Sequence, residues 1–301
     1  MRSLLFVPGD APHKLDKALA CGADALIIDL EDSVTPSEKP AARRHSAAFL
    51  ARIRDQAERP HLYVRINALQ TGMSDDDLAA VMPAAPDGIV LPKAILCADV
   101  RALDARLSLH EAANSIAAGT TSILPIATES ARAVLALLSM SEGHARMSGI
   151  TWGAEDLSAD LGAETNRDAT GSWTSPYRVA RDVTLLAAAA AQVDAIDTVH
   201  LAYRNLEGLD QECREARRDG FVAKLAIHPA QVPVINAAFT LSEAVLNQAR
   251  AVVAAFEASP TTGAIGRAGE MLDYPHLSRA QRLLASLEHR PLNLRRSPRE
   301  A

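Results

Sequence analysis

The sequence predicts a parallel (β/α)8 barrel, the TIM-barrel class of α/β fold, followed by a helical C-terminal extension. Three observations lead to this prediction. Eight short apolar runs alternate along the chain with segments of helical length and period. Most of these runs are apolar without strict alternation, as expected for parallel strands that helices cover. The length of 301 residues accommodates one barrel of about 250 residues and an added segment.

The expected strands follow one another in chain order, and each is a short apolar run bounded by loop residues. They lie at residues 4–7, 25–30, 62–66, 88–91, 122–126, 149–152, 195–199 and 223–227. The seventh has the weakest pattern, because Asp194 and Asp197 interrupt it. Between the strands, residues 37–56, 100–116 and 130–138 have the period of helices that bury one face.

Beyond the eighth strand and its helix the pattern changes. Residues 242–258 are typical of an amphipathic helix, residues 259–263 of a linker, and residues 278–287 of one further helix. The appended segment 263–288 is too small for an independent core. The expected organisation is therefore a catalytic barrel at 1–240, a helical extension at 241–289 and a disordered tail at 290–301.

Composition excludes several classes of protein. A formal net charge of -6 argues against a nucleic-acid partner. Cys21, Cys97 and Cys213 are odd in number and far apart, which predicts neither a disulfide framework nor a structural zinc site. The opening apolar run is too short for a signal peptide, and no run is long enough to span a bilayer. We expect a cytoplasmic protein with no membrane partner.

Two carboxylates follow consecutive strands. Glu129 comes after the fifth expected strand and Asp156 after the sixth. Because neighbouring strand ends of a parallel barrel meet on its catalytic face, the two carboxylates could jointly hold a hard cation such as Mg²⁺. Either residue alone would more often be a helix N-cap. Their repetition on adjacent strands favours the metal pair.

Other charged residues cluster at the same strand ends. Arg65 ends the third strand and suits either capture of a substrate carboxylate or an internal ion pair. Asp29, Glu31 and Asp32 end the second strand. Such a crowd of carboxylates is costly without a cation. We expect these three acids to accept hydrogen bonds from metal-bound water or to cap nearby loops.

A helix predicted after the first strand carries Lys14 and Lys17, and a basic helix N-terminus can receive phosphate. Surface lysines are more often merely solvated. Lys93 and His228 place further cationic or titratable groups at strand ends, and for His228 a structural hydrogen bond is as good an interpretation as catalysis.

The sequence has no G-x-S-x-G motif, no Walker loop and no G-x-G-x-x-G after the first strand.

These motifs together, in chain order, resemble the citrate lyase beta-subunit-like family of CoA-ester lyases, within the HpcH/HpaI aldolase superfamily of Mg²⁺-dependent barrels. The family includes citryl-CoA, malyl-CoA and citramalyl-CoA lyases. The resemblance rests on Arg2-Ser-Leu-Leu-Phe-Val-Pro-Gly9, Asp29-Leu-Glu-Asp32 with Lys39 and Arg43, Arg65-Ile-Asn67, Pro92-Lys93, Glu129, Gly153-Ala-Glu-Asp-Leu157 and Ile227-His-Pro-Ala-Gln231.

The resemblance implies roles for single residues. It assigns Glu129 and Asp156 to Mg²⁺, and Arg65 to the carboxylate of the 2-oxo acid. The segment 269–280 resembles the lid of malyl-CoA-type lyases, in which an aspartate covers the active site of an adjacent subunit. Asp273 is then the candidate acid/base at the acetyl methyl carbon, although it could also be a turn or helix cap before Pro275. The family also implies a homotrimer or a dimer of trimers.

The expected activity is reversible cleavage of a β-hydroxyacyl-CoA to acetyl-CoA and a 2-oxo acid, with thioester hydrolysis as a possible second step. Lys14 and Lys17 are the candidate CoA contacts. One departure from the family is Ile95, because relatives commonly carry an acid two positions after the lysine of Pro92-Lys93. The alternatives are a CoA-independent, metal-dependent aldolase of 2-oxo acids and a carrier-dependent subunit of a citrate lyase-like complex.

Overall fold

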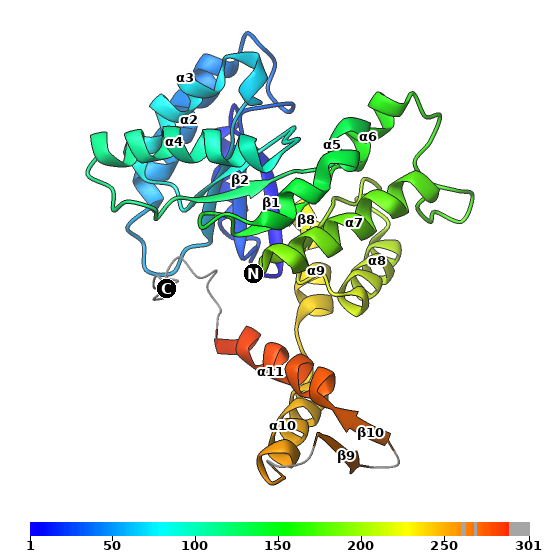
Figure 1. Cartoon of the computed structure of the whole chain (residues 1–301). Coiled ribbons are helices and arrows are strands. Elements are labelled where there is room, and N and C mark those ends of the chain that lie inside the picture. Colours follow the sequence, from blue (N-terminus) through cyan, green and yellow to red (C-terminus); the bar gives the residue numbers. More distant parts are fainter. Residues whose placement is uncertain (260–262, 268–269, 289–301) are drawn as a thin grey trace. The chain divides into compact units, whose positions relative to one another are not determined.

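The structure, a computed structural model, describes residues 1–259, 263–267 and 270–288. Its contacts divide the chain into two compact units, Met1–Phe239 and Thr240–Ala301. Figure 1 shows the first unit as strands covered by helices, and the second as a small helical unit with a two-stranded ribbon. The expected linker at 259–263 lies partly outside the described residues, and the expected tail at 290–301 lies wholly outside them.

The first unit is the predicted barrel. Its parallel strands pair in the order β5-β4-β3-β2-β1-β8-β7-β6. The ring closes between β5 and β6, where backbone hydrogen bonds join Ala127 N to Thr151 O at 3.0 Å and Ser148 N to Ile123 O at 3.0 Å. The strands are β1 (Ser3–Pro8), β2 (Ala25–Asp29), β3 (His61–Arg65), β4 (Gly88–Leu91), β5 (Ser122–Pro125), β6 (Gly149–Thr151), β7 (Asp194–Asp197) and β8 (Ala223–Ala226).

Helices alternate with these strands and cover the outside of the barrel (Figure 1). They are α1 (Pro12–Ala18), α2 (Lys39–Ile53), α3 (Ser74–Val81), α4 (Cys97–Ala113), α5 (Ala131–Ala136), α6 (Ala154–Leu161), α7 (Ser175–Ala191), α8 (Leu206–Asp219) and α9 (Val232–Phe239), with short 3-10 turns η1 (Leu69–Thr71), η2 (Met82–Ala84), η3 (Leu137–Glu142) and η4 (Pro229–Gln231).

Apolar residues at helical spacing explain how these helices attach to the sheet. In α4, Val100, Leu103 and Leu107 recur at three- and four-residue intervals and are completely buried. Ser130 begins α5 as its N-cap, accepting a hydrogen bond of 3.2 Å from the Ala133 N–H. The residue directly before this cap is Glu129, so the start of α5 fixes where that carboxylate leaves the strand end.

The second unit has its own small core. It contains α10 (Glu243–Glu257), the antiparallel strands β9 (Ala264–Arg267) and β10 (Glu270–Asp273), and α11 (Tyr274–Glu288). The core consists of Ala249, Val252, Phe256, Leu272 and Ala280. The sequence predicted only helices here, and it placed the start of the last helix at Ser278 rather than Tyr274. Within the described ranges, no helix combines the length and the apolar character needed to cross a bilayer.

Candidate functional site

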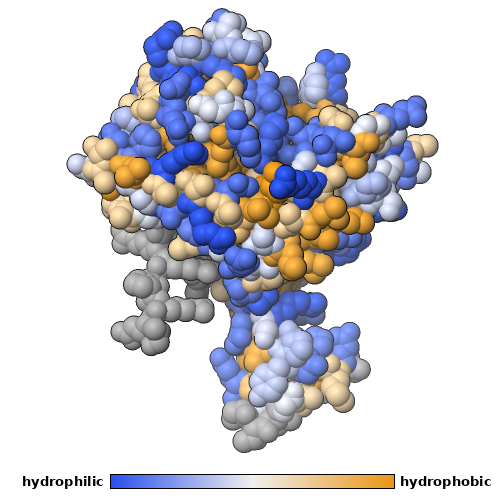
Figure 2. All heavy atoms as spheres, turned by 45° about the horizontal axis from the view of Figure 1, so that its top comes forward, coloured by the Kyte–Doolittle hydropathy of each residue, from blue (hydrophilic) through white to orange (hydrophobic). Residues whose placement is uncertain are grey.

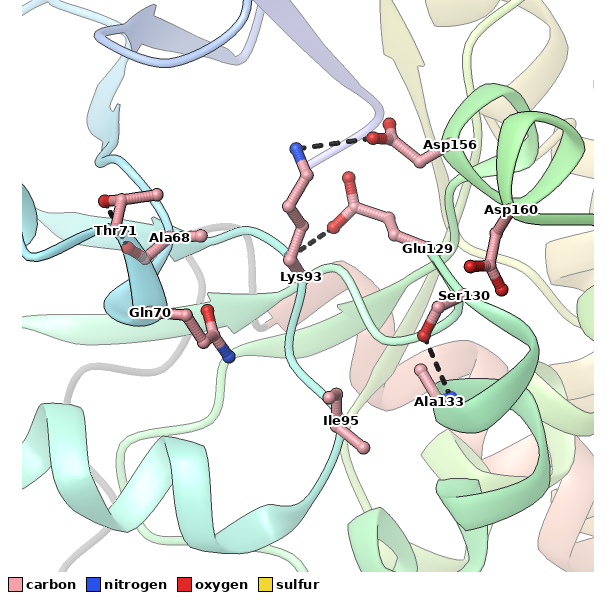
Figure 3. A pocket seen from close by; sticks show the side chains of 10 residues that line it. All are labelled: Ala68, Gln70, Thr71, Lys93, Ile95, Glu129, Ser130, Ala133, Asp156 and Asp160. Atoms are coloured by element: carbon pink, nitrogen blue, oxygen red, sulfur yellow. Dashed lines mark hydrogen bonds and ion pairs between the residues drawn. The ribbon is translucent and has the colours of Figure 1, made fainter.

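The expected site residues of the barrel meet at the carboxyl ends of the strands. A pocket of about 470 Å³ lies there, and Glu129 and Asp156 both line it. Figure 3 shows both carboxylates pointing toward the Lys93 side chain. The other lining residues are Ala68, Gln70, Thr71, Ile95, Ser130, Ala133 and Asp160. The sequence therefore predicted the meeting of Glu129 and Asp156, but not the wall that surrounds them.

Glu129 is a buried acid beside other acids. It is 6% exposed. Burial and the nearby charges of Asp156 and Glu31 raise the pKa of Glu129 from its ordinary 4.5 to about 8. A carboxyl in this setting is stabilised by a positive charge at close range, and carboxylate oxygens are the donors that Mg²⁺ prefers. The pair therefore fits a hard divalent cation.

Among the described residues, no three His, Cys, Asp or Glu side chains gather into a complete ligand set. Glu129 and Asp156 would supply two oxygen donors, and water or substrate the rest. This is the usual arrangement for Mg²⁺, which keeps several waters and binds through one or two carboxylates.

Gly153 explains how Glu129 reaches its position. A β-carbon at Gly153 would lie 2.6 Å from Cγ of Glu129, so only glycine leaves room for the carboxylate stem at the turn between β6 and α6. The Gly153 N–H donates to Oγ1 of Thr128 at 3.2 Å, which ties the two strand ends together. The glycine of the Gly153–Leu157 motif thus leaves the space that the Glu129 side chain, at the end of the neighbouring strand, occupies.

Arg65 lies at the same mouth, held by acids of the second strand. Its Nε and Nη2 each donate to the Asp29 carboxylate at 2.7 Å, and its Nη1 lies 3.0 Å from Oε2 of Glu31. Burial alone would raise the pKa of Asp29, but its hydrogen bonds to Arg65 outweigh burial and lower it. The internal ion pair that the sequence left open is therefore present.

The three acids at the end of the second strand share two cationic partners, Arg65 and Lys93. Asp29 also accepts the backbone N–H groups of Glu31 and Ser33 at 2.9 and 3.1 Å, so it caps its own loop. Glu31 and Asp32 both contact the Lys93 ammonium, at 2.6 and 3.2 Å. Burial is the main cause of the raised pKa of Glu31.

Lys93 is the site residue whose contacts sequence reasoning missed. Its Nζ lies 3.3 Å from Oδ1 of Asp156, and its backbone N–H donates to Oε2 of Glu129 (Figure 3). Burial lowers the pKa of Lys93, but the hydrogen bond to Glu31 and the surrounding negative charge outweigh burial, and the net shift is upward. Its position after the fourth strand was visible in the sequence, whereas its partners were not.

Lys39 is a second lysine that holds the loops around the site in place. It is 7% exposed, and its Nζ donates to the carbonyls of Leu30 and Glu31 at 2.9 and 3.0 Å and to Oδ1 of Asn67 at 2.6 Å. One ammonium thus joins the loop after β2 to the loop after β3. The conformation of the loop that carries Glu31 depends on this contact.

The remaining candidates belong to other elements of the structure. Lys14 and Lys17 are exposed on α1. The Nδ1 atom of His228 accepts the Ala230 N–H at 3.2 Å and its ring stacks on Tyr203, which is a structural role. Asp273 ends β10 in the second unit, where Oδ1 lies 2.5 Å from Nδ1 of His276. The hydrogen bond from His276 is the main cause of the lowered pKa of Asp273.

Comparison with known proteins agrees with this geometry. The family model described as HpcH/HpaI aldolase/citrate lyase matches residues 2–229. The chain belongs to this family. Its membership confirms both the barrel fold and the expected class of enzyme, a carbon–carbon lyase.

Several known proteins match almost the whole chain. A citrate lyase subunit beta-like protein of Mycobacterium tuberculosis is 36% identical over 281 residues, 93% of each chain. A (3S)-malyl-CoA thioesterase of Cereibacter sphaeroides is 33% identical over 294 residues, 95% of this chain and 94% of the relative. The solved structure of M. tuberculosis CitE in complex with magnesium, acetoacetate and coenzyme A has a TM-score of 0.75 and 35% identity, covering 96% of this chain and 98% of that one.

Proposed function

We propose that the protein is a Mg²⁺-dependent lyase. It cleaves a β-hydroxyacyl-CoA, such as malyl-CoA, citramalyl-CoA or citryl-CoA, into acetyl-CoA and a 2-oxo acid, or forms the thioester from these two compounds. The observation that supports this most directly is Glu129, a buried acid with a pKa near 8 beside Asp156 at the barrel mouth. The relatives named for malyl-CoA and citrate, and a relative bound to magnesium and coenzyme A, point to the same chemistry.

In this proposal Glu129 and Asp156 hold Mg²⁺. When bound, the ion supplies a Lewis acid for the oxygen that becomes the carbonyl of the 2-oxo acid. Arg65 orients the carboxylate of that acid, and Asp29 and Glu31 keep the guanidinium in place from the protein side. Glu31 and Asp32, together with Lys93, form the charged rim around the pair.

Asp273 is the proposed acid/base. In cleavage the bond between the hydroxyl-bearing carbon and the acetyl methylene breaks, the hydroxyl gives up its proton to solvent water, and Asp273 in its protonated form donates a proton to the methylene carbon. In condensation Asp273 removes that proton. Its contact with His276 supports a carboxylate held ready in its charged form, the form needed for proton removal.

Lys14 and Lys17 are the proposed contacts for the phosphates of CoA. Both are exposed on α1, next to the carboxyl end of β1. Flexible ammonium groups on an accessible helix can pair with phosphate without the burial cost that a fixed cation would carry. Their removal is expected to affect CoA binding more than divalent cation binding.

We further propose a cytoplasmic homo-oligomer, a trimer or a dimer of trimers. Large apolar side chains are exposed on neighbouring elements of the barrel, including Leu135 at 87%, Leu138 at 82% and Leu186 at 68%. Figure 2 shows apolar patches among polar side chains on the face of the barrel unit that it displays. Contiguous exposed apolar surface is typical of contact between subunits.

The test is release of acetyl-CoA from malyl-CoA, citramalyl-CoA and citryl-CoA, with and without Mg²⁺, by the wild type and by Asp273→Ala. The proposal expects Mg²⁺-dependent release from at least one thioester and a loss of about 100-fold or more in the variant. Turnover of none of the thioesters, with Mg²⁺ still bound, would overturn it. Activity on a free 2-oxo acid would then indicate an aldolase, and activity only with an acyl-carrier partner a subunit like citrate lyase beta.

A further inference from the structure

Lys93 contacts both proposed metal ligands, each with a different part of the residue. Its backbone N–H donates to Oε2 of Glu129, while its Nζ lies 3.3 Å from Oδ1 of Asp156. The same ammonium lies 2.6 Å from Oε1 of Glu31 and 3.2 Å from Oδ2 of Asp32. Figure 3 shows the side chain extending past Glu129 to Asp156. One positive charge is thus shared by three carboxylates and lies close to a fourth.

The backbone at Lys93 explains how it makes both contacts. Its φ is 53°, in the left-handed region that side chains other than glycine rarely adopt. This turn directs the N–H toward Glu129 while the side chain runs to the far side of the pocket. Strained conformations of this kind gather at functional sites, where the surrounding contacts hold them in place. Here those contacts are the carboxylates themselves.

The balance of charges at the mouth of the barrel explains what the Lys93 ammonium does there. Glu31, Asp32, Glu129 and Asp156 bring four acids together, and Arg65 is already bound to Asp29 and Glu31. A positive group is therefore needed beside Asp156 when no metal is present. A divalent cation on the same carboxylate oxygen would repel the ammonium, because the two charges would lie within a few ångströms of each other.

We propose that Lys93 is an exchangeable counter-ion: its ammonium neutralises Asp156 in the metal-free protein and yields that carboxylate to the divalent cation on binding. It keeps its contacts with Glu31 and Asp32, the two acids that are not proposed as ligands. Lys93 thereby weakens cation binding and offsets the repulsion among the acids of the metal-free mouth. This inference rests on the proposed metal role of Glu129 and Asp156, and it makes Lys93 a positioning residue.

The experiment is direct titration of the full-length chain with Mg²⁺ and with Mn²⁺ by calorimetry, without substrate. Lys93→Met removes the charge and keeps most of the side-chain volume, and Lys93→Arg keeps the charge. Arg44→Met is the matched control, because it removes one positive charge from the exposed surface of α2. The expected result is a dissociation constant about three- to tenfold lower in Lys93→Met, with Lys93→Arg and Arg44→Met within roughly twofold of the wild type.

The outcomes separate this inference from the proposed function. Weaker or unchanged binding in Lys93→Met, with normal binding by the wild type, overturns the exchange and leaves the metal site standing. Absence of binding in the wild type and in every variant overturns both. If Arg44→Met bound the cation more tightly by the same factor as Lys93→Met, the gain in affinity would be a general effect of net charge. That result would also overturn the exchange.

A second measurement follows the Lys93 ammonium in the wild-type chain itself. The chain has five lysines, so reductive ¹³C-methylation gives a simple spectrum in which the methylated groups keep their charge. The Lys93 signal, assigned by its loss in Lys93→Arg, is expected to shift when Mg²⁺ is added, while the signals of the exposed Lys14 and Lys17 stay in place. A Lys93 signal that does not move on saturation with Mg²⁺ would overturn the exchange.

Discussion

Arg65 at the end of β3 holds the carboxylate of Asp29 at the end of β2 through two parallel hydrogen bonds of 2.7 Å. The Arg65 side chain is 13% exposed and that of Asp29 2%. An arginine expected to bind a substrate carboxylate is thus already bound to a carboxylate of the protein. The fixed pair sets the plane of the guanidinium before any substrate arrives, which reduces the ordering cost of binding.

Asp29→Asn tests this arrangement. The substitution leaves Arg65 buried with one charged partner fewer, so the free energy of unfolding should fall by about 3 kcal/mol. Binding of pyruvate in the presence of Mg²⁺ should weaken by roughly tenfold, because the guanidinium loses its fixed orientation. Urea unfolding and calorimetric titration measure the two effects.

Asp24→Asn is the control for this change. Asp24 pairs with Arg2 through bonds of 3.0 and 2.7 Å in the same two-point geometry, but at the other end of β2 and with a side chain 24% exposed. Its loss should cost no more than about 1 kcal/mol and should not alter pyruvate binding. Equal destabilisation by the two variants would contradict the importance of burial at Asp29.

Glu129→Gln should remove divalent cation binding and stabilise the metal-free protein. The amide keeps the shape and can still accept the Lys93 N–H, but it removes an acid whose ionised form is disfavoured by burial and by the charges of Asp156 and Glu31. We expect Mg²⁺ affinity to fall by at least about 100-fold, since even changes to outer-shell partners cost 10–100-fold. The thermal midpoint without metal should rise.

Asp160→Asn is the matched control within the same pocket. Asp160 lines the pocket but accepts the Ala131 N–H at 2.7 Å, a helix-capping role. Its amide variant should bind Mg²⁺ within roughly twofold of the wild type, because no ligand is lost. If Asp160→Asn lost the ion and Glu129→Gln kept it, the ligand assignment would be wrong.

The sequence was sufficient for the barrel and for the meeting of the acids, for one physical reason. In a parallel barrel the end of every strand faces the same mouth, so a residue's place after its strand also gives its place in space. Glu129, Asp156, Arg65 and Asp29 all follow from this rule. It needs only the positions of strand ends, which apolar periodicity marks well.

Which charged side chains pair with one another could not be predicted from the sequence in the same way. Which of several acids binds Arg65 depends on side-chain reach across β2 and β3, and the contacts of Lys93 depend on a left-handed backbone that no pattern announces. The ribbon of β9 and β10 was missed because its stability comes from pairing of Ala264–Arg267 with Glu270–Asp273. Local propensity in these segments, the first of which contains Gly266, does not predict strands.

The ion pair between Glu111 and Arg146 predicts acid sensitivity of the barrel. Arg146 donates to both carboxylate oxygens at 2.6 and 2.7 Å, and the backbone of Gly119 and Thr121 donates as well. Burial alone would raise the pKa of Glu111, but these hydrogen bonds outweigh burial and lower it from 4.5 to about 2. The group therefore stabilises the fold above pH 4.5, and this stabilisation is lost as the pH falls toward 2.

Glu111→Gln should accordingly be less stable than the wild type by at most roughly 3 kcal/mol at pH 7, and the difference should shrink between pH 4.5 and pH 2. Urea unfolding across this range measures it. Glu142→Gln, which removes an acid 58% exposed and paired with Arg101, should show no such dependence on pH. A constant difference between wild type and Glu111→Gln at all pH values would show that the ionised pair is not its source.

Asp273 and His276 give the last prediction. Asp273→Asn should lower kcat for thioester cleavage by about 100- to 10,000-fold while Mg²⁺ affinity is unchanged, because the residue is proposed to move a proton and not to hold the ion. His276→Ala removes the partner 2.5 Å away that lowers the pKa of Asp273. The pKa of Asp273 should then rise toward its ordinary value, and the acidic limb of the rate of condensation should move to higher pH. A structural cap at Asp273 would instead lower the stability of both variants and leave the position of that limb unchanged.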